Sequence, residues 1–351
     1  MESLLKAARE HANSSSSSDD STEFLTPKIV VAGVGGAGCN TINRLARSGV
    51  RGAELIAINT DKKHLSIVSE SAKRVLIGPS LTKGLGAGGF PEIAAKAAEA
   101  SRAELEAAFA HTDLLFLCAG MGGGTGTGAA PIIADIAKAQ GAIIVSVVSF
   151  PFMLERARLK KAEEGLENLR KSADTVVVID NNRLVEFVPN LPIDQAFNVA
   201  DEITARAVRG ITETITTPSL INLDFADVRA IMQGGGISLI AVGEAKGPNR
   251  ARDIVQNTLH HRLLEVDYND ATGVLLHLTG GADMTLGEAN QIGETLTENV
   301  HQNANVIWGA RLDPSFSGKI EAIVIFTGIK GQYTLGAKQQ TNKKDMSFES
   351  I

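Results

Sequence analysis

A nine-residue segment of glycine and threonine with one methionine, GMGGGTGTG at 120–128, constrains the fold of this chain more than any other feature. It directly follows the apolar run 114–119 and precedes the alanine- and isoleucine-rich stretch 129–140, which predicts a helix. Glycine lets backbone N–H groups converge on an anion, and the first turn of a helix adds its own unpaired N–H groups. A flexible linker, the alternative, would be flanked by polar sequence. The segment therefore predicts a phosphate-binding loop between a buried strand and a helix.

A second glycine loop lies upstream, where the apolar run 28–32 leads into GVGGAG at 33–38. A predicted strand, a G-x-G-x-x-G pattern and a predicted helix follow one another, and Asp61 stands 23 positions after Gly38 at the end of the next predicted strand. Alone, this pattern is typical of dinucleotide-binding enzymes, so a Rossmann oxidoreductase is one interpretation. Two loops favour a nucleoside triphosphate instead, and neither carries the lysine of a Walker A motif.

Composition limits the classes of protein that remain. The 351 residues are enough for two domains, and a net charge of −6 gives no general footprint for nucleic acid. The sequence has no apolar stretch long enough to span a membrane and no secretory signal, so we expect a cytoplasmic protein without membrane insertion of its own. Two cysteines and seven scattered histidines show no metal-ligand spacing, so no metal site built by the protein is expected.

The order of elements predicts an α/β fold in two domains. Strands and helices alternate through 25–192, which predicts a parallel sheet covered on both faces, with helices at 38–48, 91–109 and 128–140. Apolar residues at helical spacing predict a long central helix at 193–217, followed by a smaller α+β domain at 218–330 whose last helix spans 285–303. A disordered N-terminal arm (1–24) and a short flexible tail (331–351) are expected to flank them.

Together these motifs resemble one family, FtsZ, the tubulin-like GTPases of prokaryotic cell division. The glycine-threonine segment is similar to the family's signature loop, GGAGC at 35–39 to its first phosphate loop, and NLDFAD at 222–227 to its synergy loop, here 219–227. Further similarity at 280–286 and 304–310 extends the resemblance to about 27–328. The resemblance implies a Rossmann-like GTPase domain, a central helix and a second domain. The short tail resembles an archaeal form.

The resemblance also implies a GTP site, in which Glu155 and Arg158 contact the ribose region, Asn181 and Asp201 bind the guanine edge, and Phe197 packs on the base. The family spaces the glutamate and the arginine by four residues, whereas here the spacing is three, so Arg156 competes with Arg158 for this role. Glu155 and Arg158 have the alternative of a surface ion pair, and Phe197 that of a core residue. The phosphate side is assigned to Gly35, Gly36, Ala37, Gly38, Cys39, Asn59, Asp61, Gly122, Gly123, Gly124, Thr125, Gly126 and Thr127.

The catalytic group implied by the resemblance is Asn222, Asp224 and Asp227, which act on the GTP of the next subunit in a head-to-tail filament; these residues also suit a helix N-cap. Mg²⁺ is expected through the phosphates of GTP. The implied partners are further copies of the chain, membrane-tethering proteins and other division proteins at mid-cell. The alternative is a tubulin-like filament scaffold with a cell-shape or other cytoskeletal role.

Overall fold

The computed structural model describes residues 27–182, 189–216, 220–221, 223–259, 268–269 and 271–329. The expected arm at 1–24 and the tail at 331–351 lie outside the described residues. The strands are β1 (Ile29–Val34), β2 (Ala53–Asn59), β3 (Lys73–Leu76), β4 (Leu114–Gly120), β5 (Ile143–Phe150), β6 (Thr175–Asp180), β7 (Gly236–Lys246), β8 (Gly273–Gly280), β9 (Asn305–Leu312) and β10 (Lys319–Thr327). The α-helices are α2 (Gly35–Ser48), α3 (Lys62–Ser66), α4 (Pro79–Thr82), α5 (Pro91–Ala100), α6 (Arg102–Ala108), α7 (Thr125–Ala139), α8 (Arg156–Ser172), α10 (Ile193–Thr216), α11 (Phe225–Met232), α12 (Arg250–Leu259) and α13 (Leu286–Thr297).

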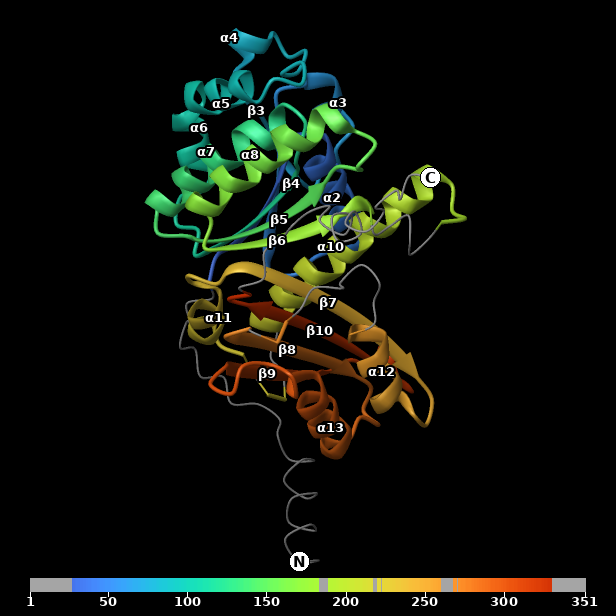
Figure 1. Cartoon of the computed structure of the whole chain (residues 1–351). Coiled ribbons are helices and arrows are strands. Elements are labelled where there is room, and N and C mark those ends of the chain that lie inside the picture. Colours follow the sequence, from blue (N-terminus) through green and yellow to red (C-terminus); the bar gives the residue numbers. More distant parts are fainter. Residues whose placement is uncertain are drawn as a thin grey trace, which may run out of the picture.

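The amino-terminal half of the sheet is parallel, in the order β3-β2-β1-β4-β5-β6. Its strands are continuous apolar runs because helices cover both faces: α5, α6, α7 and α8 lie on one, and α2 and α10 on the other (Figure 1). Val34 of β1 pairs with Ala119 of β4, so the two glycine loops leave the sheet side by side at its carboxyl edge. The expected parallel α/β architecture is confirmed.

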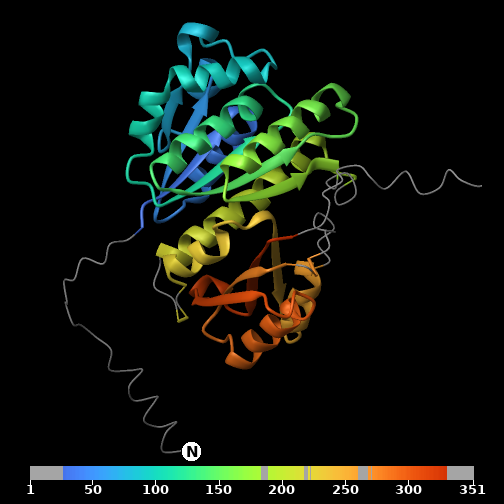
Figure 2. The same cartoon turned by 60° about the vertical axis from the view of Figure 1, so that its left-hand side comes forward.

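The carboxyl-terminal half continues the same sheet. Residues 236–238 of β7 pair in parallel with 175–177 of β6, and the order then runs β7-β10-β8-β9. The β7–β10 and β10–β8 pairs are antiparallel, whereas β8 and β9 are parallel. Helices α12 and α13 cover the outer face of this mixed sheet, and α10 lies between the two halves of the molecule (Figure 2). This is the smaller α+β unit expected from the sequence.

Helix α10 begins at the expected residue, Ile193, is described to Thr216, and joins the halves through buried and charged contacts. Val208 and Ile211 are buried in the core that it shares with both halves of the sheet. Near its carboxyl end, Glu213 accepts a hydrogen bond of 2.9 Å from Arg311 of β9. Near its middle, Glu202 pairs with Arg44 of α2 at 3.1 Å. These ion pairs tie the central helix to an element of each half.

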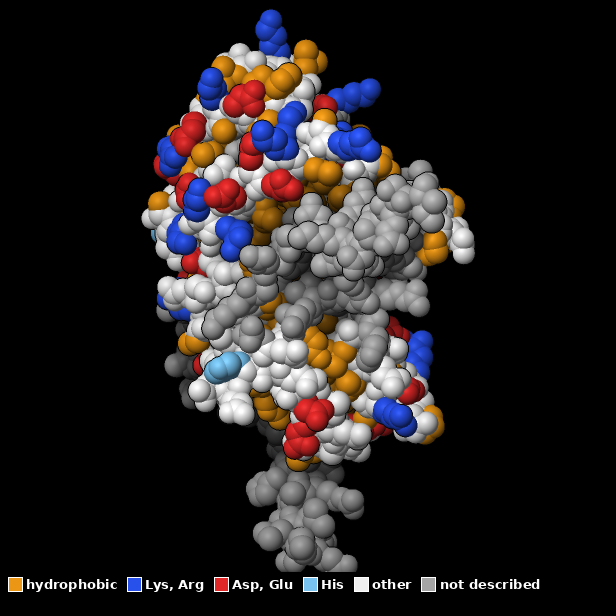
Figure 3. Space-filling view, in the orientation of Figure 1, with side chains coloured by type: hydrophobic (Ala, Val, Ile, Leu, Met, Phe, Trp, Pro, Cys, Tyr) orange, Lys and Arg blue, Asp and Glu red, His pale blue; other side chains and the backbone are white. Residues whose placement is uncertain are grey.

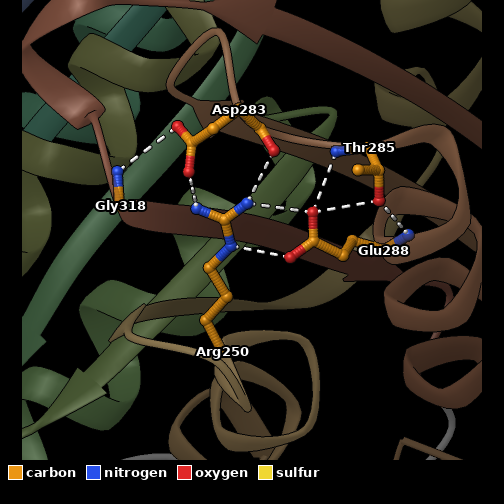
Figure 4. A network of polar contacts seen from close by, with 5 residues as sticks. All are labelled: Arg250, Asp283, Thr285, Glu288 and Gly318. Atoms are coloured by element: carbon orange, nitrogen blue, oxygen red, sulfur yellow. Dashed lines mark hydrogen bonds and ion pairs between the residues drawn. The ribbon is translucent and has the colours of Figure 1, made fainter.

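A buried arginine fixes the amino-terminal ends of α12 and α13. Arg250 is only 6% exposed, and its guanidinium donates to both oxygens of Glu288 and to the carboxylate and carbonyl of Asp283 (Figure 4). Glu288 also forms the capping box of α13 with Thr285. These bonds, with the Arg250 guanidinium first among them, lower the pKa of Glu288 to about 2. The motif 280–286 is therefore held by a fully hydrogen-bonded charge cluster.

The structure corrects several predicted helix boundaries. The single helix expected at 91–109 is wrong: α5 ends at Ala100 and α6 begins at Arg102, because the Ser101 hydroxyl leaves the helical pattern to accept a hydrogen bond from Gly78 N at 2.9 Å. The helices expected at 38–48 and 128–140 begin earlier, at Gly35 and Thr125, inside the glycine loops. Helix α13 ends at Thr297 instead of residue 303. Glycine signals a turn in sequence, yet here it forms the first turn of both helices.

The described helices and one face of the surface can be read for apolar and charged character. No helix within the described part of the chain is both long and apolar enough to cross a bilayer. On the face seen in Figure 3, Lys and Arg side chains alternate with Asp and Glu over the upper part of the molecule, so neither sign of charge dominates there.

Candidate nucleotide site and acidic loop

The two glycine loops are packed against each other at the carboxyl edge of the sheet. An added Cβ at Gly38 would strike the carbonyl of Cys118, and one at Gly126 would strike the carbonyl of Gly120. Gly35 lies against the backbone of Gly126, so the amino-terminal turns of α2 and α7 are adjacent. Both turns expose unpaired backbone N–H groups at the same place. This arrangement is an anion cradle, and larger residues at these two closely packed positions would prevent it from forming.

A third glycine loop, residues 84–90, completes the cradle and was missed in the sequence. Backbone conformations with positive φ dominate it: Gly84, Gly86, Gly88 and Gly89 all have φ between 61° and 88°. An added Cβ on Gly124 would lie 2.9 Å from Ala87 and 3.2 Å from Gly89 N, so this loop rests directly on the signature loop. The signal for it was the cluster GLGAGG at 84–89, which no apolar strand directly precedes.

Hydrogen bonds between polar side chains at the end of β2 fix the residues next to the glycine loops. Asn59 is buried; its Oδ1 accepts from Asp61 N at 3.2 Å, and its Nδ2 lies 3.8 Å from the Cys39 Sγ. The hydroxyls of Thr60 and Thr125 lie 2.7 Å apart and join β2 to the first turn of α7. Asp61 caps α3 by accepting from His64 N at 3.0 Å. Burial raises the pKa of the Cys39 thiol to about 12, so Cys39 is a packing residue without thiolate chemistry.

Glu155 and Arg158 form the ion pair that was the alternative to a ribose contact, at the start of α8. The Arg158 guanidinium donates to Glu155 Oε2 at 2.7 Å, while Glu155 Oε1 accepts from Phe152 N at 3.2 Å. The Arg158 side chain is 62% exposed, but its Cβ and carbonyl abut Gly122 of the signature loop. The pair thus borders the cradle. Arg156 is exposed in the first turn of the same helix.

The three residues assigned to the base are Asn181, which directly follows β6, and Phe197 and Asp201 of α10. The Asn181 Oδ1 is buried and has no hydrogen-bond partner within the described residues. Burial raises the pKa of Asp201 to about 6, against the opposing effect of the Arg44 guanidinium. Phe197 is 42% exposed and packs edge-on against Phe152 with 5.6 Å between ring centroids, so the alternative of a core role for Phe197 is wrong. An unpaired amide and a costly carboxylate are groups that a bound ligand can satisfy.

Asp224 and Asp227 form a capping box at the amino end of α11. Asp227 N donates to Asp224 Oδ1 at 2.7 Å, and Asp224 N donates to Asp227 Oδ2 at 3.4 Å. The helix-capping interpretation is therefore confirmed, and Asp224 remains exposed. Asn222 lies outside the described residues.

The acids are remote from the cradle of their own chain. The segment before them pairs Ile221 with Ala310 of β9, the last strand of the sheet, and α11 ends where Met232 O accepts from Thr175 at the amino end of β6. Helix α11 therefore lies toward the amino ends of the central parallel strands, which are six to eight residues long, or about 20 to 26 Å. The glycine loops, in contrast, lie at the carboxyl ends of β1 and β4. The acids and the glycine loops of one chain therefore lie at opposite ends of the parallel strands.

The described residues fit a nucleotide without a protein-built metal cage. The glycine loops suit phosphate oxygens, and the unpaired Asn181 oxygen suits an N–H donor on a base. No group of three or more His, Cys, Asp or Glu side chains that would hold a metal ion occurs within the described ranges.

Comparison with known proteins agrees with this geometry. Residues 28–189 match "Tubulin/FtsZ family, GTPase domain", and residues 236–330 match "FtsZ family, C-terminal domain". The chain is 53% identical over 344 residues to "Cell division protein FtsZ 2" of Methanocaldococcus jannaschii, covering 94% of this chain and 90% of that protein. It is 50% identical over 350 residues to the protein of the same name from Haloferax volcanii, covering 100% of this chain and 87% of that one.

The chain belongs to the tubulin/FtsZ family. A solved structure titled "FtsZ dimer, empty (M. jannaschii)" superposes with a TM-score of 0.82 at 44% identity and covers 93% of this chain and 92% of that one. Membership confirms the fold and GTPase activity, and with it guanine-nucleotide binding, expected from the motifs. Because both relatives are cell division proteins, the cell-division role is favoured over the scaffold alternative. The family match does not by itself assign individual residues.

Proposed function

We propose that this FtsZ-family protein binds GTP across its three glycine loops and hydrolyses it only at a head-to-tail contact between two subunits. The observation that carries the proposal is that the acids and the cradle lie at opposite ends of the parallel strands, about 20 Å or more apart. A second copy stacked along the same axis supplies its acids to the first copy's nucleotide. Each contact then contains one complete site.

Within this site, the guanine base forms hydrogen bonds with two polar side chains, Asn181 and Asp201, that the protein itself does not fully satisfy. The Asn181 Oδ1 accepts from an N–H of guanine, and ionised Asp201 accepts from the paired N1 and N2 donors. Phe197, which is half exposed beside Phe152, packs on the base. Arg158 lies where its guanidinium reaches the ribose or nearby phosphate, because its Cβ abuts the signature loop. Arg156, two residues earlier in the chain, makes no such contact with the glycines of the signature loop in the described part of the chain.

The phosphates lie on the amino-terminal turns of α2 and α7, whose N–H groups face developing negative charge during hydrolysis. Gly35, Thr125 and Gly126 lie where these two turns meet, so we propose that their backbone N–H groups bind the phosphates. When bound, Mg²⁺ would neutralise phosphate charge, held through phosphate oxygens and waters. Asp224 and Asp227 of the next subunit orient the attacking water, on a helix end fixed by their own capping box. Asn222 is proposed as a third member of this group.

The contact is heterologous, since the cradle of one subunit meets the acidic end of another. A heterologous contact whose rotation does not close the ring generates an open filament. We propose that such filaments form the division structure at mid-cell in the cytoplasm, and that other proteins tether them to the membrane.

Phosphate release from GTP, measured with Mg²⁺ over a hundredfold range of protein concentration alongside light scattering, tests this proposal. We expect both signals to rise above a common threshold concentration. Full turnover by dilute protein that scatters no light would contradict the shared site, because a single chain would then suffice.

A further inference from the structure

The third glycine loop is anchored differently at its two ends. Its first half is fixed by backbone hydrogen bonds, from Lys62 N to Gly84 O at 2.9 Å and from Gly86 N to Thr60 O at 3.1 Å. In its second half, residues 87–90, Ala87 is buried in the core, and one side chain forms a hydrogen bond to the segment. Lys161 of α8 donates from Nζ to Gly89 O at 2.7 Å. No other side chain within the described residues hydrogen-bonds to 85–90.

Lys161 makes a second contact with the same loop. Its ammonium lies 5.5 Å from the centroid of the Phe90 ring, within the range of a cation–π interaction. The neighbouring lysine shows that this geometry is specific: the Lys160 side chain is 84% exposed, and among the described residues its ion pair is with Glu164, at 4.0 Å. Two adjacent lysines on one helix therefore have different roles, and only Lys161 contacts the loop.

The part of the loop that Lys161 holds faces the signature loop. Gly89 has φ of 78°, and its N–H lies 3.2 Å from where a Cβ on Gly124 would stand. Gly88 and Gly89 donate no backbone hydrogen bond within the described part of the chain. Free N–H groups in successive turn conformations form a concavity that binds anions. These donors are available to a ligand only while the loop stays against Gly124.

Sheet order indicates which phosphate these donors meet. The residues assigned to the base, Asn181 and Asp201, come from the end of β6 and from α10, whereas the third loop follows β3 at the opposite edge of the parallel sheet. A nucleotide that runs from β6 across β4 and β1 places its terminal phosphate nearest to 84–90. GDP has no group at that position.

We propose that Lys161 is a positioning residue that clamps residues 87–90 against the signature loop, so that the Gly88 and Gly89 N–H groups select the terminal phosphate of GTP over GDP. This inference rests on the proposed GTP site. Lys161 acts through the loop backbone, because its Nζ bonds to the Gly89 carbonyl. Its positive charge adds a stronger hydrogen bond than a neutral donor would give.

The test compares dissociation constants for fluorescent GTP and GDP analogues in the full chain and in three variants, Lys161→Met, Lys161→Arg and Lys160→Met. We expect Lys161→Met to weaken GTP binding about tenfold, the size expected for one lost charge-assisted hydrogen bond, with little change for GDP. Lys161→Arg should restore most of the selectivity, and Lys160→Met should behave as the unmodified protein. Hydrogen exchange should show faster exchange at 87–90 in Lys161→Met alone.

The outcomes separate this inference from the proposed function. Equal weakening of GTP and GDP by Lys161→Met, or unchanged binding of both, would overturn the clamp while leaving the GTP site intact. Failure of the unmodified chain to bind either nucleotide would overturn the proposed function itself. Loss of selectivity in Lys160→Met would also contradict the clamp, because that side chain does not touch the loop.

Discussion

Mixing two inactive variants tests whether one site needs two chains. The first variant, Asp227→Asn, keeps a side-chain oxygen that can accept from Asp224 N, so the capping box survives. We expect its free energy of unfolding to change by less than about 0.5 kcal/mol. Its turnover should fall by about 10²- to 10⁴-fold, the range for a group that assists proton transfer or positions water.

The second variant, Asn181→Ala with Asp201→Asn, removes base recognition from a chain whose acids are intact. Neither change should unfold the protein, because the Asn181 Oδ1 has no hydrogen-bond partner among described residues and burial already disfavours the Asp201 charge. Two lost hydrogen bonds to guanine, one of them to a charged group, weaken GTP binding about a hundredfold or more. Each variant alone should therefore release little phosphate.

Equimolar mixing should restore activity if the acids act in trans. In a random filament, about one quarter of the contacts place an intact base site against intact acids, which sets the ceiling for recovery at about one quarter of the unmodified rate. A fluorescently labelled base-site variant that co-sediments with Asp227→Asn in the presence of GTP would establish that the variant is incorporated into the mixed filaments. Incorporation without recovery would refute the reasoning from the sheet, since it would mean that the acids serve their own chain.

Three further predictions concern the base site, the charge cluster and the glycine packing. Burial raises the pKa of Asp201 from 3.8 to about 6, so the contribution of this group to folding stability should fall as the pH rises from about 4 to about 6. GTP affinity needs the carboxylate, so it should rise with pH through about 6 in fluorescence titrations and lose this dependence in Asp201→Asn. Arg250→Met leaves two carboxylates unpaired and should lower the free energy of unfolding by about 3 kcal/mol in urea, while Arg252→Met, at an exposed position on the same helix, should not. Gly126→Ala should lower the melting temperature because its Cβ strikes Gly120, but Gly123→Ala should leave it unchanged, since its Cβ meets no atom within 4 Å.

The sequence alone predicted those features whose residues are neighbours along the chain. The signature loop could be predicted because an apolar strand, glycines and a helical pattern follow one another, and their pairing in the sheet places them together. The same holds for α10, whose periodicity matches its bounds. The third loop escaped prediction because its cradle role depends on contact with Gly124, a residue distant in sequence. The break at Ser101 escaped because a hydroxyl bond to Gly78 decides it.

The lysine clamp shows most directly what a sequence cannot contain. Lys160 and Lys161 are chemically identical and adjacent, and both lie in a helix that the pattern predicts. An α-helix makes one turn in about 3.6 residues, so neighbouring side chains point about 100° apart. The packing of α8 therefore decides which of the two lysines contacts the third loop. That packing places Ala162 in the core and leaves Lys160 in solvent, which turns Lys161 toward Gly89. A change in the phase of α8 by one residue would exchange the two lysines, so nucleotide selectivity here depends on how the helix is seated as much as on which residues it contains.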